Sequence, residues 1–398
     1  MSIIETNHAG SITFLENSVN INSGTMNFAG VRNTGTQYLE AYQELGFETS
    51  WIDMPQEVNR AGHLIAEHKG SKGKRLLLIG HLDTVFEENS PFQIYEPMDS
   101  LAKGPGVADM KGGNVVMLYA LKALHQAGVL KDARIIVMLH GDEESAGKPL
   151  TVSRGDIISA AMRSDVALGF EGASGFSHAT IARRGSSGWT LKVAGTRGHS
   201  SRIFSKKYGA GAIFEASRIL HDFYNQVPEE YLTFNPGLML GGTAIDYDSV
   251  QSSGSAFGKS NVISQEVIVK GGLRFLSEEQ KKQARKKMKV IVSENLPGTS
   301  AKIHFTDSYP AMSPTPGNME VLKVLDGVSQ DMGFGPVEGY DPGKRGAGDI
   351  SFVAEYLDCL DGLGVMGNGA HSEEEYVNLT TVKALTKRVA VLIYRLTR

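Results

Sequence analysis

Residues 75–83 read RLLLIGHLD, and residues 134–144 read RIIVMLHGDEE. In each stretch an unbroken apolar run ends directly at imidazole and carboxylate side chains. Apolar runs of this length are typical of strands that are buried on both faces of an α/β sheet. In open α/β sheets, ligands bind in the crevice outside the carboxyl ends of the strands. The two stretches therefore predict an α/β fold with a functional site at one edge of its sheet.

Further elements of the same kind flank these two strands. Apolar runs predict additional strands over residues 165–170 and 362–366. Helical patterns cover residues 114–127, residues 319–332 and a segment that begins at Asp349. Strands that alternate with helices indicate an α/β architecture.

A different pattern occupies the middle of the chain. Between residues 183 and 307, alternating strand patterns and two amphipathic helices predict two helices on a small antiparallel sheet. We therefore expect an α/β domain formed by residues 1–182 and 308–398, interrupted by an inserted α+β domain at residues 183–307.

Composition limits the classes of partner and metal site. The chain has 398 residues, and its 40 Lys and Arg against 44 Asp and Glu give a net charge of −4, which argues against a nucleic-acid partner. The basic run KKQARKKMKV at residues 281–290 is predicted to be the solvated face of a helix. Cys359 is the single cysteine, so no thiolate cluster can form and any metal requires His and carboxylate ligands.

The sequence carries no sign of a membrane segment. No run approaches the about 18 apolar residues of a membrane span, and the first thirty residues lack the basic start and apolar core of a signal peptide. We expect a cytoplasmic protein without membrane contact; the alternative is a mature periplasmic or secreted form from which a signal has been removed.

The residues at the strand ends suggest metal chemistry. His81 and Asp83 fit a metal-binding imidazole that is oriented by an acid, although a local strand-capping pair is an alternative. The loop GPGVADMKGG at residues 104–113 presents Asp109 directly before a helix. A glycine-rich loop can also bind phosphate, but this one lacks the GK[ST] ending and the GxGxxG spacing of the known phosphate loops.

Two further segments add acids and a second imidazole. The adjacent carboxylates of Glu143 and Glu144 repel each other unless a cation compensates, and such a pair allows one to bind a metal while the other takes a proton from water. A solvated acidic turn is the alternative. Glu171 follows the strand predicted at residues 165–170, and His371 follows the apolar GLGVM near the C-terminus.

Taken together, these motifs carry a resemblance to a known family. HLDTV, GPGVADMKGG, GDEE, the later Glu171, GHSS and GNGAHSEEEYV occur in one order over nearly the whole chain. This series resembles the dizinc exopeptidase family that includes glutamate carboxypeptidase, aminoacylase, acetylornithine deacetylase and succinyl-diaminopimelate desuccinylase. The opening VNINSGTMNFAGV is most similar to the glutamate carboxypeptidase branch. The resemblance implies a mixed-sheet catalytic domain with an inserted dimerisation or lid domain.

The resemblance implies two Zn²⁺ ions per chain, with Co²⁺ or Mn²⁺ as substitutes. Asp109 would bridge them, Glu171 would join His81 on one ion, and Glu144 would join His371 on the other. By the same resemblance Asp83 orients His81, and Glu143 is the general base. Relatives often have a cis peptide after the bridging aspartate, here Asp109-Met110.

The inserted domain and a late loop supply the remaining predicted contacts. By resemblance, His199 reaches the scissile carbonyl from the partner subunit of a homodimer and stabilises the oxyanion. Asn261 and Arg274 resemble the pair that binds substrate, although Gly272 replaces an acidic residue found in relatives. Asp349 lies in a loop, KRGAGD, that resembles a glycine-rich loop near the substrate.

The implied reaction is hydrolysis of an amide bond next to a free carboxylate by a metal-bound hydroxide, as in a carboxypeptidase. N-acyl amino acid deacylation uses the same metals and base and is the main alternative. A dipeptidase, or an inactive relative kept as a binding module, is the other alternative. The expected partners are a small peptide or an N-acyl amino acid and a second copy of the chain bound through the inserted domain.

Overall fold

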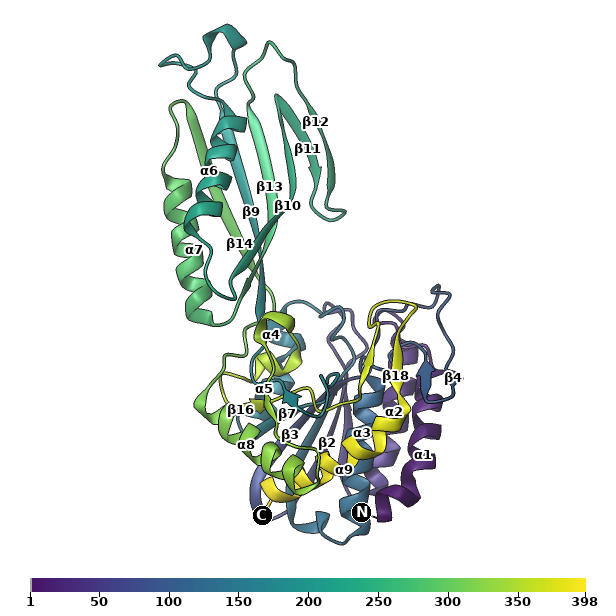
Figure 1. The fold of residues 1–398 in the computed structure, drawn as a ribbon. Coiled ribbons are helices and arrows are strands. Elements are labelled where there is room, and N and C mark those ends of the chain that lie inside the picture. Colours follow the sequence, from purple (N-terminus) through teal and green to yellow (C-terminus); the bar gives the residue numbers. More distant parts are fainter. Residues whose placement is uncertain (1) are drawn as a thin grey trace. The chain divides into compact units, whose positions relative to one another are not determined.

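The computed structural model describes residues 2–398 and divides them into two compact units (Figure 1). Unit 1 comprises residues up to Arg183 together with Met312–Arg398. Unit 2 is Arg184–Ala311. No helix in residues 2–398 combines the length and the apolar character needed to cross a membrane.

Unit 1 is built on a mixed six-stranded sheet. In spatial order its strands are β1 (Glu48–Ile52), β2 (His63–Lys69), β6 (Ala133–His140), β3 (Lys72–His81), β7 (Val166–Gly169) and β16 (Asp358–Leu360). β3 runs parallel to β6 and β7, and β16 runs parallel to β7, whereas β1 and β2 are antiparallel additions. The last six residues of β3 and of β6 are buried, as the apolar runs predicted.

Helices cover this sheet and share its apolar core. They are α1 (Ser2–Val19), α2 (Phe28–Glu44), α3 (Lys111–Gln126), α4 (Leu150–Ser153), α5 (Gly155–Ala161), α8 (Pro316–Asp331) and α9 (Leu379–Leu396). Leu15, Met117 and Leu392 place α1, α3 and α9 in one buried cluster. Gly113 lets α3 approach the sheet closely, because a Cβ there would lie 2.0 Å from the Phe170 carbonyl oxygen.

Short elements complete unit 1. A four-stranded sheet has the order β17 (Gly367–Asn368), β18 (Tyr376–Asn378), β5 (Leu101–Lys103) and β4 (Glu96–Met98). β8 (His178–Ala179) pairs with β15 (Glu338–Gly339), and single 3-10 turns lie at Leu130–Asp132, Pro342–Lys344 and Asp349–Phe352.

Two sequence predictions in this region are wrong. The helix expected from Asp349 is only the 3-10 turn Asp349–Phe352, because the chain must return to the sheet at β16. The strand expected at residues 362–366 is irregular, because Gly362 has a φ of 75° and interrupts the extended backbone.

Unit 2 places two helices on one face of an antiparallel sheet. The order is β10 (Thr233–Gly242), β13 (Glu266–Phe275), β9 (Gly185–Gly195) and β14 (Thr299–Asp307). The helices α6 (Ala212–Gln226) and α7 (Glu278–Ser293) cover the buried Trp189, Leu191 and Val269. A 3-10 turn lies at Ser200–Arg202, and the hairpin of β11 (Ala244–Asp248) and β12 (Ser253–Phe257) follows β10.

Candidate metal centre

His81 ends β3, and its side chain is 1% exposed. Its Nδ1 lies 3.0 Å from the carbonyl oxygen of Asp83. Because a ring nitrogen next to a carbonyl oxygen carries the proton and donates it, Nε2 keeps its lone pair. That atom lies 3.2 Å from Asp109 Oδ1 and 3.8 Å from Glu171 Oε1. A histidine fixed in this way is suited to bind a metal through Nε2.

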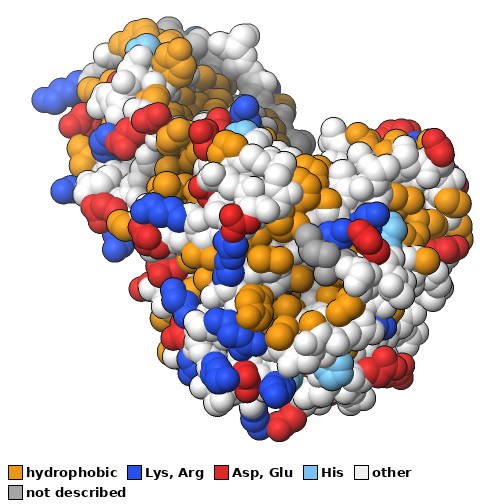
Figure 2. Space-filling model, turned by 60° about the horizontal axis from the view of Figure 1, so that its bottom comes forward, with side chains coloured by type: hydrophobic (Ala, Val, Ile, Leu, Met, Phe, Trp, Pro, Cys, Tyr) orange, Lys and Arg blue, Asp and Glu red, His pale blue; other side chains and the backbone are white. Residues whose placement is uncertain are grey.

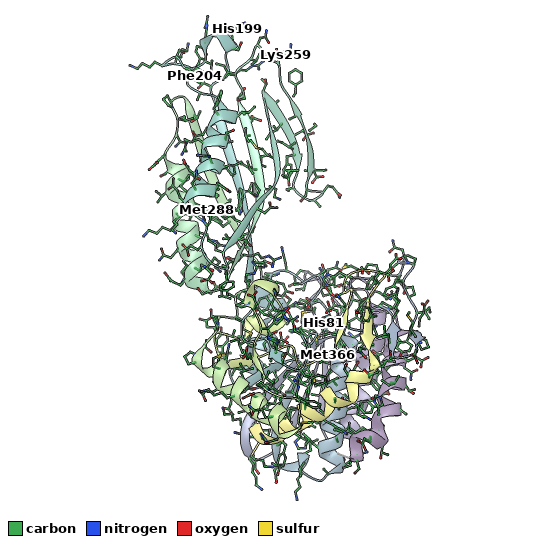
Figure 3. The ribbon with its side chains drawn as sticks, viewed as in Figure 1. His81, His199, Phe204, Lys259, Met288 and Met366 are labelled. Carbon is green, nitrogen blue, oxygen red and sulfur yellow. The ribbon has the colours of Figure 1, made fainter. Side chains whose placement is uncertain are left out.

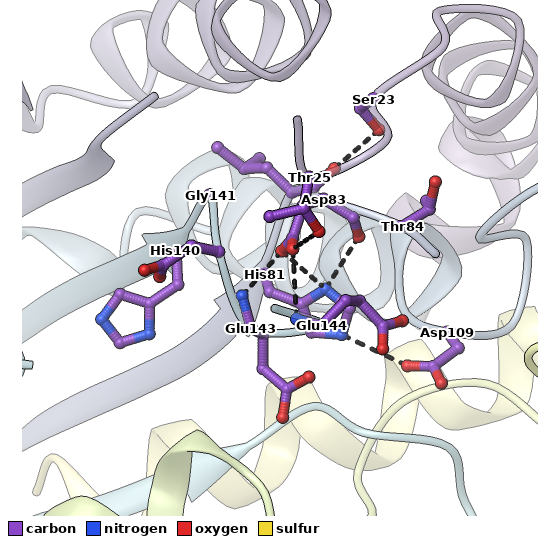
Figure 4. Close-up of polar contacts among 12 residues, drawn as sticks. Ser23, Thr25, His81, Asp83, Thr84, Asp109, His140, Gly141, Glu143 and Glu144 are labelled. Atoms are coloured by element: carbon purple, nitrogen blue, oxygen red, sulfur yellow. Dashed lines mark hydrogen bonds and ion pairs between the residues drawn. The ribbon is translucent and has the colours of Figure 1, made fainter. Parts of the chain in front are cut away.

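Asp83 holds the loop after β6 in place (Figure 4). Its Oδ1 accepts the backbone N–H of Glu143 at 2.9 Å, and its Oδ2 accepts that of Glu144 at 3.1 Å. The hydroxyl of Thr25 also donates to Oδ2, at 2.7 Å. The Asp83 carboxylate is fully buried, so these three donors compensate its charge. Asp83 thus fixes the backbone from which two acidic side chains project.

Asp109 lies between the two imidazoles of the site. Its Oδ1 faces Nε2 of His81 and its Oδ2 faces Nε2 of His371, each at 3.2 Å. Glu144 Oε2 lies 3.1 Å from the same His371 nitrogen. The Asp109-Met110 peptide bond is cis, as the resemblance implied. One carboxylate is therefore shared between two separate sets of donors.

The donor atoms form two triads that meet at Asp109. In each triad the atoms lie within 4.8 Å of one another: one is His81, Asp109 and Glu171, and the other is Asp109, Glu144 and His371. Each triad has one imidazole nitrogen, one carboxylate of its own and one shared carboxylate. Nitrogen and oxygen donors in this combination suit Zn²⁺, Co²⁺ or Mn²⁺.

The electrostatics of the site also fit cations. Burial, together with the neighbouring Asp109, raises the pKa of Glu171 to about 7. Hydrogen bonds to Asp109 and Glu144 raise the pKa of His371 to about 10. The His371 shift and the smaller, Asp109-derived part of the Glu171 shift reflect neighbouring negative charge, which divalent cations would neutralise. The residues present therefore fit a dinuclear metal centre.

Glu143 borders these donors without belonging to either triad that contains Asp109. Its carboxylate shares a third group of converging atoms with His81 and Glu144. Burial is the largest cause that raises the pKa of Glu143 well above its ordinary value, and Asp349 and Glu171 raise it further. A carboxylate at this position is suited to take up and release a proton.

Glu375 is a buried acid that the sequence analysis missed. Its Oε2 accepts the backbone N–H of Gly106 at 3.0 Å, and its Oε1 accepts those of Ala108 and Asp109 at 2.8 and 2.9 Å. The side chain thus fixes the loop of Asp109 from the segment that also carries His371. The signal in the sequence is the third glutamate of GNGAHSEEEYV, but its partners are backbone groups and cannot be read from a motif.

Asp349, predicted to contact substrate, lies close enough to Glu143 to raise its pKa, and its own carboxylate is bound inside the protein. It is 4% exposed, its Oδ1 accepts the Nε–H of Arg154 at 2.8 Å, and its Oδ2 contacts Nδ1 of His140. Arg154 in turn donates to Asp142 Oδ1 at 2.6 Å. Both carboxylate oxygens thus have partners inside the protein, and a substrate contact by Asp349 stays a prediction.

Unit 2 brings His199 and Asn261 together. Residues 199 and 262 form an isolated bridge, and the Asn261 carbonyl accepts the N–H of Ser200 at 2.9 Å. Figure 3 shows His199 at the end of the unit that also carries Lys259. Nδ1 of His199 accepts the backbone N–H of Ser201 at 3.2 Å, so the proton of the neutral ring resides on Nε2, which can donate.

Arg274 lies at the other end of β13. It is eight residues beyond Glu266, roughly 26 Å along an extended strand. Within one chain, unit 2 therefore does not bring Arg274 to His199 and Asn261. Among the described residues, the exposed Arg274 side chain makes no hydrogen bond or ion pair, which leaves its guanidinium fork open to a ligand.

A mixed α/β sheet that presents two histidines and two glutamates around one shared aspartate defines a class of protein, the dinuclear metallohydrolases. Comparison with known families agrees. Residues 77–395 match peptidase family M20/M25/M40, and the chain belongs to this family.

Individual relatives are similar along nearly the whole chain. Carboxypeptidase G2 of Pseudomonas sp. (strain RS-16) is 28% identical over 392 residues, covering 96% of this chain and 88% of that protein. The aminopeptidase PepT of Bacillus cereus ATCC 10987 superposes with a TM-score of 0.78 at 18% identity, over 98% of this chain and 99% of its own.

A further solved structure is that of the YXEP protein of Bacillus subtilis, a dinuclear metal binding peptidase of the M20 family. It superposes with a TM-score of 0.68 at 14% identity, over 99% of both chains. The chain is thus a metallopeptidase of the M20 family with the fold of that family.

Proposed function

We propose that this protein is a zinc-dependent exopeptidase of the carboxypeptidase type, which cleaves an amide bond next to a free carboxylate. The observation that carries the proposal is the pair of triads that share Asp109. His81 and Glu171 would hold one ion, and Glu144 and His371 would hold the other. When bound, the two ions supply an activated water and polarise the scissile carbonyl.

Glu143 is the general base of the proposed reaction. Its backbone is held by Asp83, so its carboxylate is positioned before substrate binds. The raised pKa of Glu143 arises from burial and favours transfer of the proton onward to the leaving amine. Asp83 contributes in a second way, because its carbonyl oxygen sets the tautomer of His81.

His199 would act across a homodimer. Its Nε2–H is suited to donate to an oxyanion, and it lies far along unit 2 from Arg274. The side of unit 2 formed by α6 and β10 carries exposed apolar side chains: Phe214 is 53% exposed and Met239 is 42% exposed. The ring centroid of the exposed Phe204 lies 5.7 Å from that of Phe214 in a tilted arrangement. We assign the contact between copies to this side.

The dimer is tested by mixing two inactive variants, His199→Ala and Glu143→Gln. If His199 acts across the interface, each mixed dimer has one complete site, so the mixture recovers roughly a quarter of wild-type activity. A mixture that stays inactive after verified subunit exchange would show that His199 does not act in this way.

The position of Arg274 supports a substrate with a free carboxylate, because the open guanidinium fork can bind both carboxylate oxygens. The class of substrate is tested with a panel of N-acyl amino acids and of dipeptides with free or blocked α-amines. A carboxypeptidase cleaves N-blocked dipeptides, whereas a deacylase prefers simple acyl groups. A strict requirement for a free α-amine would contradict both functions and indicate a dipeptidase.

A further inference from the structure

A groove of about 890 Å³ lies in unit 2 beside the edge strand β14. Its lining combines positive charge with an apolar floor and comes from four strands and a helix. The side chains that matter are Lys192, Lys270, Lys289, Lys302, Tyr247 and Ile268.

The four lysines of this groove lack carboxylate partners. In residues 2–398, the ion pairs of the basic helix α7 and its neighbours use Lys281, Arg285 and Lys287, and none of the groove lysines lies within 4.0 Å of a carboxylate. Lys192 and Lys302 are direct cross-strand partners. Like charges at such positions destabilise a sheet unless an anion lies between them.

The net charge of unit 2 as a whole is also positive. Unit 2 contains 17 Lys and Arg against 11 Asp and Glu, a net charge of +6, whereas unit 1 has a net charge of −10. The basic face of Lys282, Lys286 and Lys289 on α7 continues the groove, because Lys289 lines both. The field around this part of the protein therefore attracts anions.

The backbone of β14 is open along the groove. β14 is an edge strand that pairs with β9 alone, and its residues 300–307 make no other backbone hydrogen bond within the described chain. An edge lysine such as Lys302 can protect a strand from aggregation. That role does not explain Lys192 and Lys270, which lie on the two strands farther in, or Lys289 on the helix.

We propose that this groove binds an extended acidic peptide segment, which pairs with β14 as an added strand and places its carboxylates against the four lysines. The hydroxyl oxygen of Tyr247 is buried and makes no hydrogen bond in the described residues, so a peptide group can satisfy it. Lys270 lies 5.4 Å from the centroid of the Tyr247 ring, which orients its ammonium group.

Other partners fit less well. Sites for single-stranded nucleic acid use several aromatic side chains as stacking platforms, and Tyr247 is the one Phe, Trp or Tyr residue in this lining, with His304 as the only other ring. On the face shown in Figure 2, basic and acidic side chains are interspersed, and they form no continuous basic stripe there. A second copy joined through the same edge would bring two sets of lysines together.

The test measures binding of a fluorescein-labelled, C-terminally amidated decaglutamate to the full chain by fluorescence anisotropy. The amide removes the C-terminal α-carboxylate that the proposed hydrolysis requires. The side-chain carboxylates remain, and the lysine variants show whether they bind in the groove. The Lys192→Gln/Lys302→Gln variant should raise the Kd about tenfold. Lys206→Gln/Lys207→Gln, which removes the same charge from unit 2 away from the groove, should leave it unchanged.

A second measurement distinguishes binding through backbone pairing with β14 from binding through charge attraction alone. Decaglutamate that is N-methylated at alternate residues keeps its charge but loses half of its backbone donors, and it should bind about tenfold more weakly. Three results would each overturn the proposal. They are an equal rise of the Kd in both double-lysine variants, an equal Kd for the methylated and unmethylated peptides, and a lower Kd for a ten-nucleotide oligothymidine than for decaglutamate.

Discussion

At the scale of single residues, the site depends on buried acids that bind backbone N–H groups. Asp83 holds the backbone of Glu143 and Glu144, and Glu375 holds the backbone of Asp109. Neither Asp83 nor Glu375 belongs to a triad. We infer that they keep the carboxylates of the two triads in place before an ion arrives, which would lower the cost of binding.

Glu375→Gln is expected to weaken metal binding by about 10-fold to 100-fold. The new amide nitrogen is a donor and would face backbone donors in the loop of Asp109. The affinity is measured by titrating the metal-free protein against a chromophoric chelator. Glu374→Gln is the matched control, because that side chain is exposed and pairs with Lys103. Equal affinities in the two variants would contradict the role given to Glu375.

The sequence made most of the candidate donors predictable. His81 ends a buried apolar strand, and Glu144 and Glu171 each follow one, so the local pattern predicted that they lie at one edge of the sheet. The partners of Glu375 and Asp349 could not be predicted in this way. Asp349 lies 195 residues from Arg154, and its carboxylate resembles a surface acid until the fold buries it.

At the scale of elements, we infer that the close approach of α3 to Phe170, the residue after β7, sets the spacing of the two proposed metal positions. Asp109 precedes α3, and Glu171 follows β7. The apolar run at residues 165–170 made the strand before Glu171 easy to predict. The segment after Asp349 was harder, because glycines and tertiary contacts decide its path rather than periodicity.

Gly113→Ala is therefore expected to destabilise the protein by about 1–3 kcal/mol and to weaken metal binding. The new Cβ would meet the Phe170 carbonyl oxygen at 2.0 Å, so α3 must move away from the strand that precedes Glu171. Chemical denaturation measures the change in the free energy of unfolding. Gly155→Ala is the control, because nothing lies within 4 Å of its added methyl group. Similar stabilities for the two variants would refute the packing argument.

At the scale of the whole molecule, the metal-free protein should lose stability as pH rises. Burial raises the pKa of Glu171 and of Glu375 from 4.5 to about 7, so the unfolded chain releases these protons first. The folded state then binds more protons, and the free energy of unfolding falls between pH 4.5 and about 7 by an amount on the order of 3 kcal/mol for each group. The pKa of His371 is raised from 6.5 to about 10, so the folded protein loses further stability as pH rises through this range.

Denaturation of chelator-treated and metal-loaded protein at several pH values measures this effect. Metal loading should flatten the dependence, since bound cations stabilise the ionised carboxylates. A metal-free protein whose stability increases between pH 5 and pH 9 would be inconsistent with the arrangement of these acids.

The central claim is that Glu143 serves as the general base beside two metals held by its neighbours. The most direct measurement is the turnover of Glu143→Gln after its content of two metal ions per chain has been verified. The variant should retain both ions, because Glu143 is absent from the two triads that share Asp109, and its kcat should fall by about 10²-fold to 10⁴-fold. A fully loaded Glu143→Gln enzyme with kcat within a factor of a few of wild type would contradict the claim.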